Sequence, residues 1–410
     1  MVHVSSSRVE KGEALYRRAC EIIPGGTQTN SKQPPEALRG AYPPYIVRGE
    51  GAYVWDLDGN RYIDHKLGCG PVVLGHAYPA VVEAAARQLR DGLVYGSAHP
   101  SEVRLAELII ETVPCAEMVR FLKTGAEGTS AAVRLARTYT GRELVLSCGY
   151  HGWHDWGMAK NPIVAGIPDC LRGLTLGFPY GDYDKLEALF QAQGDKVAAV
   201  VFAAPYHVPP VEIGHFLQRV RELTHKHGAV LIYDEIVTGF RVSLGGVQEL
   251  TGVIPDLAVF SKAMANGFPI AAVTGCKEVM RAWDRTTISS TFGGEAVSIA
   301  AAIASITELR EKGVPSELAR RGAWLRNQAE QIGAEMGLRL RGCGFDALPN
   351  ILLEGEDARL ADSLQRALLL EGVFPYFPLW YISFSHDMTV LAESVAALRR
   401  AAAKVVEEKE

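Results

Sequence analysis

The chain has 410 residues, of which 42 are Lys or Arg and 47 are Asp or Glu, so its formal net charge is −5. That balance excludes the basic surface of a general nucleic-acid-binding protein, and a hydrophobic content of 48% excludes a disordered chain. No apolar run is long enough to cross a bilayer, and residues 1–15 lack the apolar core of a secretory signal. We therefore expect a cytoplasmic protein without a nucleic-acid or membrane partner.

The cysteines follow neither a disulfide pattern nor a zinc pattern, because none belongs to a CxxC pair and their number is odd. Reduced thiols are expected, which fits a cytoplasmic location. The seven cysteines stand at positions 20, 69, 115, 148, 170, 276 and 343.

The first 65 residues predict a helix, a loop and a hairpin. Apolar residues at helical spacing favour an amphipathic helix over 9–23, which Pro24 ends. Residues 27–45 have the composition of an extended loop. The run from Ala52 to Ile63 contains an Asp58-Gly59 turn between two strand-forming stretches, which is typical of a β-hairpin.

Between residues 75 and 275, helical stretches alternate with short, fully apolar runs. Such runs are typical of a mostly parallel sheet that helices cover on both faces, so we expect an α/β fold. The runs are 119–122, 144–148, 197–204, 229–233, 257–260 and 270–273.

The residues beyond Gly294 have the pattern of a smaller α+β unit. We expect helices over 295–311, 316–336, 357–371 and 388–408, and strands over 338–342 and 349–354. The expected division is an N-terminal segment that belongs to the small domain, a large ligand-binding domain, and the rest of the small domain, over 1–65, 66–300 and 301–410.

Ligands of open α/β sheets bind at the carboxyl ends of the strands, so the residues after each apolar run are candidates for a site. After 119–122 comes a loop that contains Gly125 and Ala126 and opens a helix. Its backbone N–H groups could hold a phosphate. A tight strand-to-helix turn without a ligand explains the same residues.

Aromatic residues are crowded after the run 144–148. Tyr150 is a candidate floor for a planar ring. His151, His154 and Asp155 together also suggest a metal site, but no further ligand cluster accompanies them, and we predict no metal. Core packing with a polar rim is the other alternative.

Charged residues follow two other apolar runs. Asp234 ends one buried strand and Lys262 follows another, and each is costly there unless a partner meets it. A buried ion pair between them is the structural alternative. A desolvated lysine is also a good Schiff-base nucleophile, and a buried aspartate can hold the proton of a pyridine nitrogen. Together with the phosphate loop and Tyr150, these residues indicate pyridoxal 5′-phosphate.

Long segments of the chain resemble class III, pyridoxal-phosphate-dependent aminotransferases. The branch that they resemble most contains glutamate-1-semialdehyde 2,1-aminomutase and its aminotransferase relatives. The resemblance covers residues 15–400 in order. The segments that carry it are 51–64 (GAYVWDLDGNRYID), 70–84 (GPVVLGHAYPAVVEA), 118–143 (MVRFLKTGAEGTSAAVRLARTYTGRE), 149–152 (GYHG) and 233–275, which begins YDEIVTGF and contains FSKAMANG.

The resemblance implies fold type I and a homodimer with shared active sites. It implies that Lys262 is the Schiff-base lysine and that Asp234 partners the ring nitrogen. It places Ile236 on the ring face opposite Tyr150, with His151 also beside the cofactor. Gly125 and Ala126 would hold the phosphate, and Thr291 would reach the phosphate of the other subunit's cofactor.

The chain departs from the aminomutase pattern at positions that bear on the substrate. Lys32 stands where the aminomutase has a carboxylate-binding arginine, and a lysine cannot fork onto a carboxylate. Gly68 and Cys69 replace Ser-Trp, which leaves room for a larger substrate. The glutamate expected within 375–386 is missing. Candidate pocket-wall residues are Trp153, His154 and Tyr381.

We expect an aminotransferase that moves an amino group from a small-molecule donor to a keto or aldehyde acceptor in a ping-pong reaction. An intramolecular aminomutase is the first alternative, and a lid over 156–180 could retain its intermediate. A cofactor-binding protein without turnover is a second. A nicotinamide dehydrogenase is a third, although GCGPVVLG (68–75) has the wrong spacing for a dinucleotide fingerprint.

Overall fold

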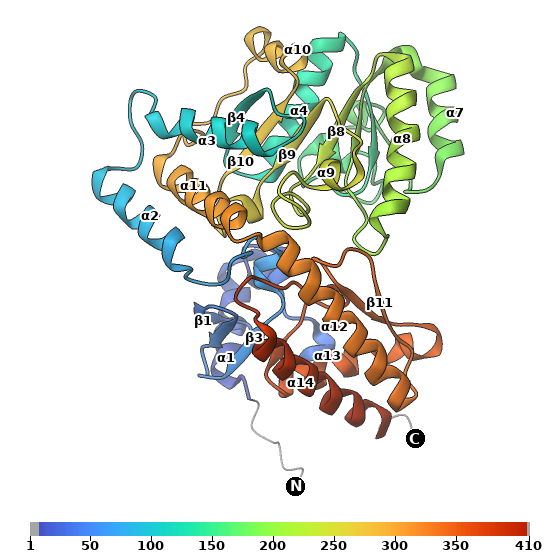
Figure 1. Cartoon of the computed structure of the whole chain (residues 1–410). Coiled ribbons are helices and arrows are strands. Elements are labelled where there is room, and N and C mark those ends of the chain that lie inside the picture. The colour runs from blue at the N-terminus through green and yellow to red at the C-terminus, as the bar shows by residue number, and fades with distance from the viewer. Residues whose placement is uncertain (1–7, 408–410) are drawn as a thin grey trace. The chain divides into compact units, whose positions relative to one another are not determined.

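A computed structural model describes residues 8–407 of the chain (Figure 1). The chain forms two compact units, each with its own core. The small unit combines Met1–Tyr78 with Glu317–Glu410, and the large unit is Pro79–Ser316. The sequence analysis places the corresponding boundaries at 65/66 and 300/301.

The large unit contains a mixed, mostly parallel sheet of seven strands in the order β4-β10-β9-β8-β7-β5-β6. β5, β6, β7, β8 and β9 pair in parallel, whereas β10 is antiparallel to both of its neighbours. The expected α/β fold is confirmed. The strands are β4 (Met118–Leu122), β5 (Leu144–Cys148), β6 (Thr175–Gly177), β7 (Val197–Phe202), β8 (Val230–Asp234), β9 (Leu257–Phe260) and β10 (Ala271–Gly275).

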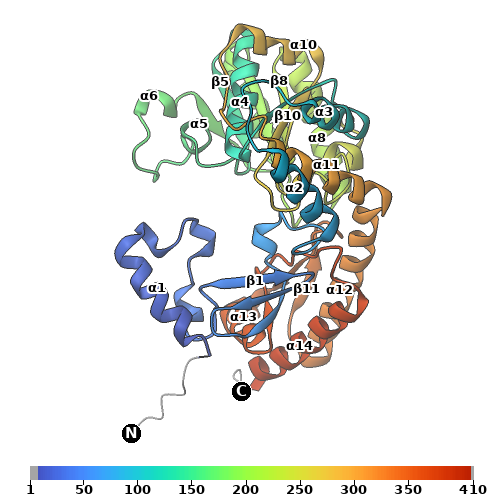
Figure 2. The ribbon, with the colours of Figure 1, turned by 90° about the vertical axis from the view of Figure 1, so that its left-hand side faces the viewer.

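Helices cover both faces of this sheet because β7, β8 and β9 are apolar and buried along their length. Figure 2 shows α4 and α8 on opposite sides, and both helices contact β7 and β8. The α5–α6 segment extends away from the sheet (Figure 2). The helices are α2 (Pro79–Asp91), α3 (Pro100–Thr112), α4 (Gly125–Thr140), α5 (Asp155–Met158), α6 (Asp169–Arg172), α7 (Tyr183–Gln193), α8 (Pro210–His227), α9 (Val247–Thr251), α10 (Lys277–Met280) and α11 (Ala296–Glu311).

The small unit joins the two ends of the chain through a four-stranded sheet, β1-β2-β3-β13. The hairpin of β2 and β3 is confirmed, and Asp56 accepts hydrogen bonds from two N–H groups of its turn. The remaining strands form a two-stranded sheet. The elements are α1 (Glu10–Ile22), β1 (Ile46–Glu50), β2 (Tyr53–Asp56), β3 (Arg61–Asp64), α12 (Val314–Met336), β11 (Leu340–Cys343), β12 (Asn350–Leu353), α13 (Ala361–Leu370), β13 (Val373–Phe374) and α14 (Met388–Glu407).

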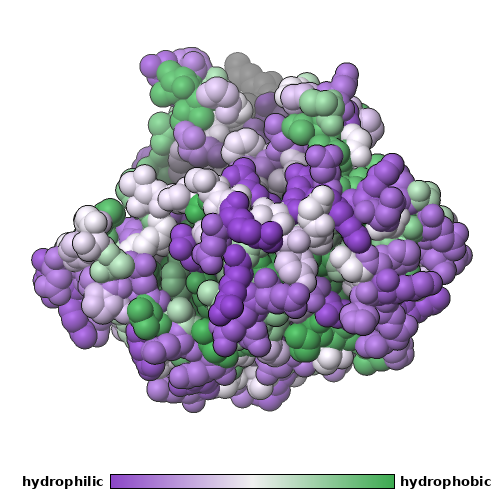
Figure 3. Space-filling view, turned by 90° about the horizontal axis from the view of Figure 1, so that it is seen from above, coloured by the Kyte–Doolittle hydropathy of each residue, from purple (hydrophilic) through white to green (hydrophobic). Residues whose placement is uncertain are grey.

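The surface in Figure 3 is mostly hydrophilic, with hydrophobic residues in several separate groups. Within residues 8–407, none of the helices has the length and apolar character needed to span a membrane.

Candidate active site

The strands that carry the expected site residues end at one edge of the large sheet. β5, β8 and β9 run in parallel, and β4 runs in the same direction because β10 is reversed between β4 and β9. β8 ends at Asp234, and the segments that follow β4, β5 and β9 contain Gly125, Tyr150 and Lys262. The topology therefore gathers all four residues at the carboxyl edge, where open α/β sheets bind ligands.

The start of α4 is a cradle for an anion. Thr124 and Glu127 form a capping box that uses the N–H groups of both residues. In the described part of the chain, the N–H groups of Gly125 and Ala126 have no hydrogen-bond partner. Two free N–H groups at the positive end of a 16-residue helix suit a phosphate.

Glycine is required at two points around this cradle. A Cβ on Gly125 would lie 2.5 Å from Cδ1 of Ile236, so the cradle is in close contact with this residue, which lies two positions after the end of β8. A Cβ on Gly152 would lie 2.7 Å from Cβ of Ala126, and Gly152 has a positive φ of 98°. The loop after β5 therefore packs directly on the start of α4.

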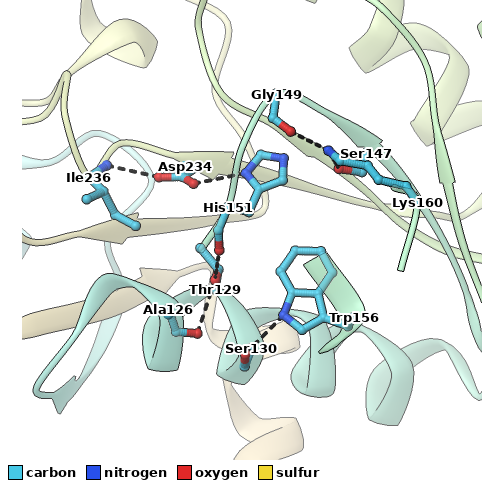
Figure 4. A network of polar contacts seen from close by, with 10 residues as sticks. All are labelled: Ala126, Thr129, Ser130, Ser147, Gly149, His151, Trp156, Lys160, Asp234 and Ile236. Carbon is cyan, nitrogen blue, oxygen red and sulfur yellow. Dashed lines mark hydrogen bonds and ion pairs between the residues drawn. The ribbon is translucent and has the colours of Figure 1, made fainter. Parts of the chain in front are cut away.

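The carboxylate of Asp234 is held on both oxygens (Figure 4). Oδ2 lies 2.9 Å from Nδ1 of His151, and Oδ1 accepts a hydrogen bond of 3.2 Å from the N–H of Ile236. Both side chains are buried. Because His151 faces Asp234 through Nδ1, that nitrogen carries the proton that the two atoms share.

The position of His151 is itself fixed by α4 and α5. Its carbonyl accepts a 2.8 Å hydrogen bond from the hydroxyl of Thr129, and its ring stacks on Trp156 with a centroid separation of 5.9 Å (Figure 4). Trp156 in turn donates to the hydroxyl of Ser130. The other ring nitrogen of His151, Nε2, is buried and has no partner within the described residues.

Lys262 stands at the end of the strand next to Asp234. In the β8–β9 register, Asp234 pairs with Val259, and Lys262 follows three residues later. Lys262 is half-buried and has a φ of 45°, in the left-handed region that side-chain-bearing residues rarely adopt. Such backbone strain gathers at functional sites, and the buried residues 263–265 behind Lys262 hold it in place.

Two charged residues of this edge, the buried Glu235 and the partly buried Lys160, were not assigned from the sequence. Burial raises the pKa of Glu235 to about 7, although it accepts hydrogen bonds from the N–H groups of Val247 and Gln248. Lys160 donates a 2.7 Å hydrogen bond to the hydroxyl of Ser147, and burial lowers its pKa. The sequence contained a signal for Glu235 alone, because that residue directly follows Asp234.

The other expected residues of the large unit lie on its surface. The side chains of Tyr150 and Trp153 are 69% and 73% exposed, and Thr291 is also exposed. Nδ1 of His154 lies 2.7 Å from the hydroxyl of Ser130, so His154 and His151 have different partners. Within residues 8–407, no group of three His, Cys, Asp or Glu side chains could hold a metal ion.

Two expected substrate residues belong to the small unit. Lys32 is exposed on a short 3-10 helix, Asn30–Lys32. Tyr381 is buried, and its ring would be 2.7 Å from a Cβ on Gly70.

The residues at this edge fit pyridoxal 5′-phosphate. The free N–H groups of α4 suit its phosphate, the buried Asp234 suits a protonated ring nitrogen, and the strained Lys262 suits its aldehyde. Ile236, between Asp234 and the start of α4, offers an apolar contact for a ring. This fold and this set of groups define a fold type I pyridoxal-phosphate enzyme.

Comparison with known proteins leads to the same class. The sequence pattern of the family described as Aminotransferase class-III matches residues 39–348. The chain is 34% identical to a 3-aminobutyryl-CoA aminotransferase of Cloacimonas acidaminovorans, over 97% of this chain and 98% of that one. It is also 34% identical to a glutamate-1-semialdehyde 2,1-aminomutase of Methanobrevibacter smithii, over 94% and 96% of the two chains.

A solved structure agrees over nearly the whole fold. The FumI protein of Sphingopyxis sp. MTA144, solved in its PLP internal aldimine form, superposes with a TM-score of 0.89, at 30% identity and 97% coverage of both chains. The chain therefore belongs to the class-III aminotransferase family. It is a pyridoxal-phosphate-dependent aminotransferase, which confirms the fold, the cofactor and the enzyme class expected from the sequence.

Proposed function

We propose that Lys262 and Asp234 carry out the amino transfer, from a small-molecule amino donor to a keto or aldehyde acceptor. The observation that carries this proposal is the arrangement of two neighbouring strand ends. One ends in a buried carboxylate that His151 and a backbone N–H hold, and the other leads into a strained lysine. When bound, the cofactor supplies an electron sink for the electrons of the substrate's Cα–H bond.

Lys262 is the proposed proton carrier of the reaction. With the cofactor bound, its Nζ would accept the proton of the donor's α-carbon as general base and would then return a proton to the cofactor as general acid, at C4′. The acceptor half-reaction uses the same atoms in the reverse order.

Asp234 is the proposed partner of the ring nitrogen. Its negative charge favours the protonated nitrogen, which strengthens the electron withdrawal of the ring. The N–H donors of His151 and Ile236 fix the carboxylate in one orientation, at 2.9 and 3.2 Å. His151 acts as a positioning residue, because it contacts Asp234.

The remaining cofactor contacts complete the proposal. Gly125 and Ala126 bind the phosphate through their N–H groups, and Ile236 packs on one face of the ring. Tyr150 is proposed for the opposite face. Its 69% exposure is compatible with that role, since a stacking residue must present its ring to the ligand.

We further propose a homodimer in which Thr291 reaches the phosphate of the partner subunit's cofactor. Large hydrophobic side chains are exposed on and after α2, on α3 and beside Thr291, which supports an interface there. The N–H of Ala296 donates to the carbonyl of Leu93, so two of these segments are joined. The exposed residues are Val82, Leu89, Leu93, Val94, Tyr95, Val103, Ile110 and Phe292.

The proposed location is the cytoplasm. All seven cysteines are free thiols in the structure, which supports a reducing compartment.

An intramolecular aminomutase is the second candidate, and the 34% identity to an aminomutase is what favours it. The absence of an aromatic side chain at Gly68 and Cys69, and a lysine at position 32, favour a bulkier or less acidic substrate than glutamate semialdehyde. Turnover of glutamate semialdehyde without an added amino donor would decide for the aminomutase.

The test of the proposed function is an absorption spectrum of the purified holoenzyme, recorded while single amino acids are added. Transamination predicts that one donor bleaches the yellow band and that a keto acid restores it. A band that no amino donor bleaches would exclude the transfer to a separate acceptor. Failure to form a band with added pyridoxal phosphate would exclude the role of Lys262.

A further inference from the structure

The aromatic side chain that packs on His151 comes from outside the strands that carry the site. Trp156 lies in the first turn of α5, at the start of the segment that extends away from the sheet (Figure 2). A Cβ on Gly157 would lie 3.4 Å from the carbonyl oxygen of Gly152 and 3.9 Å from that of His151. This turn of α5 therefore packs closely on the loop after β5, which brings Trp156 beside His151.

The indole of Trp156 lies almost parallel to the imidazole of His151. The interplanar angle is 14° and the ring centroids are 5.9 Å apart (Figure 4). The N–H bond at Nδ1 lies in the plane of the imidazole, so the orientation of that plane decides where the bond points. Its acceptor is Oδ2 of Asp234, at 2.9 Å. A side chain that fixes the plane of His151 therefore also directs its N–H at the carboxylate.

Few other contacts fix the plane of this imidazole. Within the described residues, Nε2 of His151 is buried and has no hydrogen-bond partner. The hydroxyl of Thr129 holds the backbone carbonyl of His151 at 2.8 Å, but not the ring. Rotation of a histidine ring about its Cβ–Cγ bond has only broad preferences. The stacked Trp156 therefore restricts a rotation that the polar contacts leave largely open.

Trp156 is itself anchored to α4. Its Nε1 donates a 3.0 Å hydrogen bond to the hydroxyl oxygen of Ser130. That oxygen also lies 2.7 Å from Nδ1 of His154, but a hydroxyl oxygen has two lone pairs and can accept from Trp156 whichever way its own proton points. Because Thr129 and Ser130 are successive residues of α4, one turn of this helix holds both the backbone of His151 and the indole that packs on its ring.

We propose that Trp156 is a positioning residue of the amino transfer and acts through His151 on the carboxylate of Asp234. The indole fixes the plane of the imidazole, and the imidazole N–H then holds Oδ2 in one place. The carboxylate thereby presents a single orientation to the ring nitrogen of the cofactor. This inference rests on the proposed role of Asp234.

A purely structural role for Trp156 is the alternative. The side chain also packs against the apolar core that α4 forms with the large sheet, so its removal should lower stability in either case. The structural role predicts that substitutions of Trp156 and His151 affect kcat independently, so that their effects multiply. The positioning role predicts that the loss of Trp156 has no further effect on kcat once His151 is replaced.

The experiment is a double-mutant cycle of the holoenzyme with Trp156→Leu, His151→Asn and the two substitutions together. Trp283→Leu is the matched control, because Trp283 packs on the same core while its ring faces the guanidinium of Arg120, 4.6 Å from the centroid. Trp156→Phe keeps a ring on His151 but removes the N–H donor to Ser130, and it keeps the test valid if Trp156→Leu does not fold.

Two quantities are measured for each protein. The first is kcat at saturating cofactor. The second is the rate at which the Nδ1 proton of His151 exchanges with water, followed by NMR in the full chain with and without cofactor. The signal of this proton is assigned by its absence from His151→Asn.

We expect Trp156→Leu to lower kcat by about fivefold and Trp156→Phe by about threefold, and neither change to lower it further in the His151→Asn background. The Nδ1 proton should exchange faster in both variants, whereas the Trp283 control should match the unaltered chain in both quantities. Effects that multiply in the cycle, or an unchanged exchange rate, would overturn the proposal. The exchange rate without cofactor does not depend on Lys262, so a failure here is distinguishable from a failure of the proposed function.

Discussion

The carboxyl edge of the large sheet and the segment around Lys66 in the small unit surround a buried charge in different ways. At the edge, the carboxylate of Asp234 is met by the imidazole of His151 and by a backbone N–H. In the small unit, the Nζ of the buried Lys66 donates to the carbonyl of Ser31 and to the hydroxyl of Tyr42 and lies near aromatic rings, and the nearby charge of Asp64 favours its protonated form. At the edge the main partner of the buried charge is a ring nitrogen, whereas in the small unit the direct partners are neutral dipoles and aromatic rings.

Among the proposed active-site residues, replacement of Lys262 should have the largest effect on activity. We expect Lys262→Ala to lower kcat by roughly 10²–10⁴-fold through the lost proton transfer alone, and to abolish the yellow band. Steady-state kinetics and an absorption spectrum check this. Lys160→Ala is the matched control, because Lys160 is the other partly buried lysine near the same loops and bonds to Ser147 instead. A variant without Lys262 that keeps its band would contradict the assignment.

Neutralising Asp234 is the next largest change. Asp234→Asn keeps the shape of the side chain but removes the negative charge that favours the protonated form of the ring nitrogen. We therefore expect kcat to fall by about 10²–10³-fold. The cofactor should still bind, since its phosphate contacts are unchanged. Single-turnover kinetics with saturating cofactor measure the effect. A loss of cofactor affinity with unchanged kcat would show that Asp234 binds the ring without activating it.

Glu235 shows what a buried acid does at the same edge without a basic partner. Its pKa is raised to about 7, so the folded chain holds a proton that the unfolded chain releases near pH 4.5. Its contribution to stability is therefore greatest at low pH and falls by about 3 kcal/mol as the pH rises from 4.5 through 7. Denaturant unfolding at pH 5 and pH 8 should show this loss in the unaltered chain and a smaller loss in Glu235→Gln. Equal losses in the two proteins would refute it.

Replacing His151 tests whether this residue acts on the reaction by holding the carboxylate of Asp234 in position. His151→Asn removes a hydrogen bond to a charged group, so kcat should fall by about tenfold and the pH dependence of the cofactor band should shift. His154→Asn serves as the control, since its ring bonds to Ser130. An effect on stability alone, with the pH profile unchanged, would make His151 purely structural.

The close approach of Gly125 to Ile236 should give the smallest effect. Gly125→Ala places a methyl group 2.5 Å from Cδ1 of Ile236, which must move, at a cost of about 1 kcal/mol in stability and with weaker cofactor binding. Gly173→Ala is the control, because a Cβ there meets no atom within 4 Å. The double variant Gly125→Ala/Ile236→Ala should regain the stability lost to crowding. Thermal unfolding of the three variants tests this; no recovery would exclude the clash.

Most residues at the carboxyl edge of the large sheet could be predicted from the sequence, because each one follows a short apolar run that is recognisable by itself. Asp234 and Lys262 follow apolar runs that are long enough to identify as strands, and parallel strands bring their ends to one edge. The contact of His151 with Asp234 could not be predicted, since it joins residues 83 positions apart through the packing of a loop. The strands β6 and β13 have three and two residues, too few to form a periodic pattern.

The burial of Lys66 in the small unit could not be predicted for a different reason. Lys66 lies between Asp64 and Gly68 in a polar segment, where a lysine is normally exposed. Its burial results from Tyr42 and Phe374, which come from segments far apart in the chain. A cluster that is assembled from distant segments leaves no local pattern in the sequence.

The most direct test of the central assignment is the chemical location of the cofactor. The holoenzyme is reduced with borohydride, which fixes the pyridoxyl group to its lysine, and is then digested and analysed by mass spectrometry. We predict that the added mass lies on the peptide that contains Lys262, within FSKAMANG. A label on Lys160, or on any other lysine, would contradict the assignment of Lys262 and the proposed proton transfer with it.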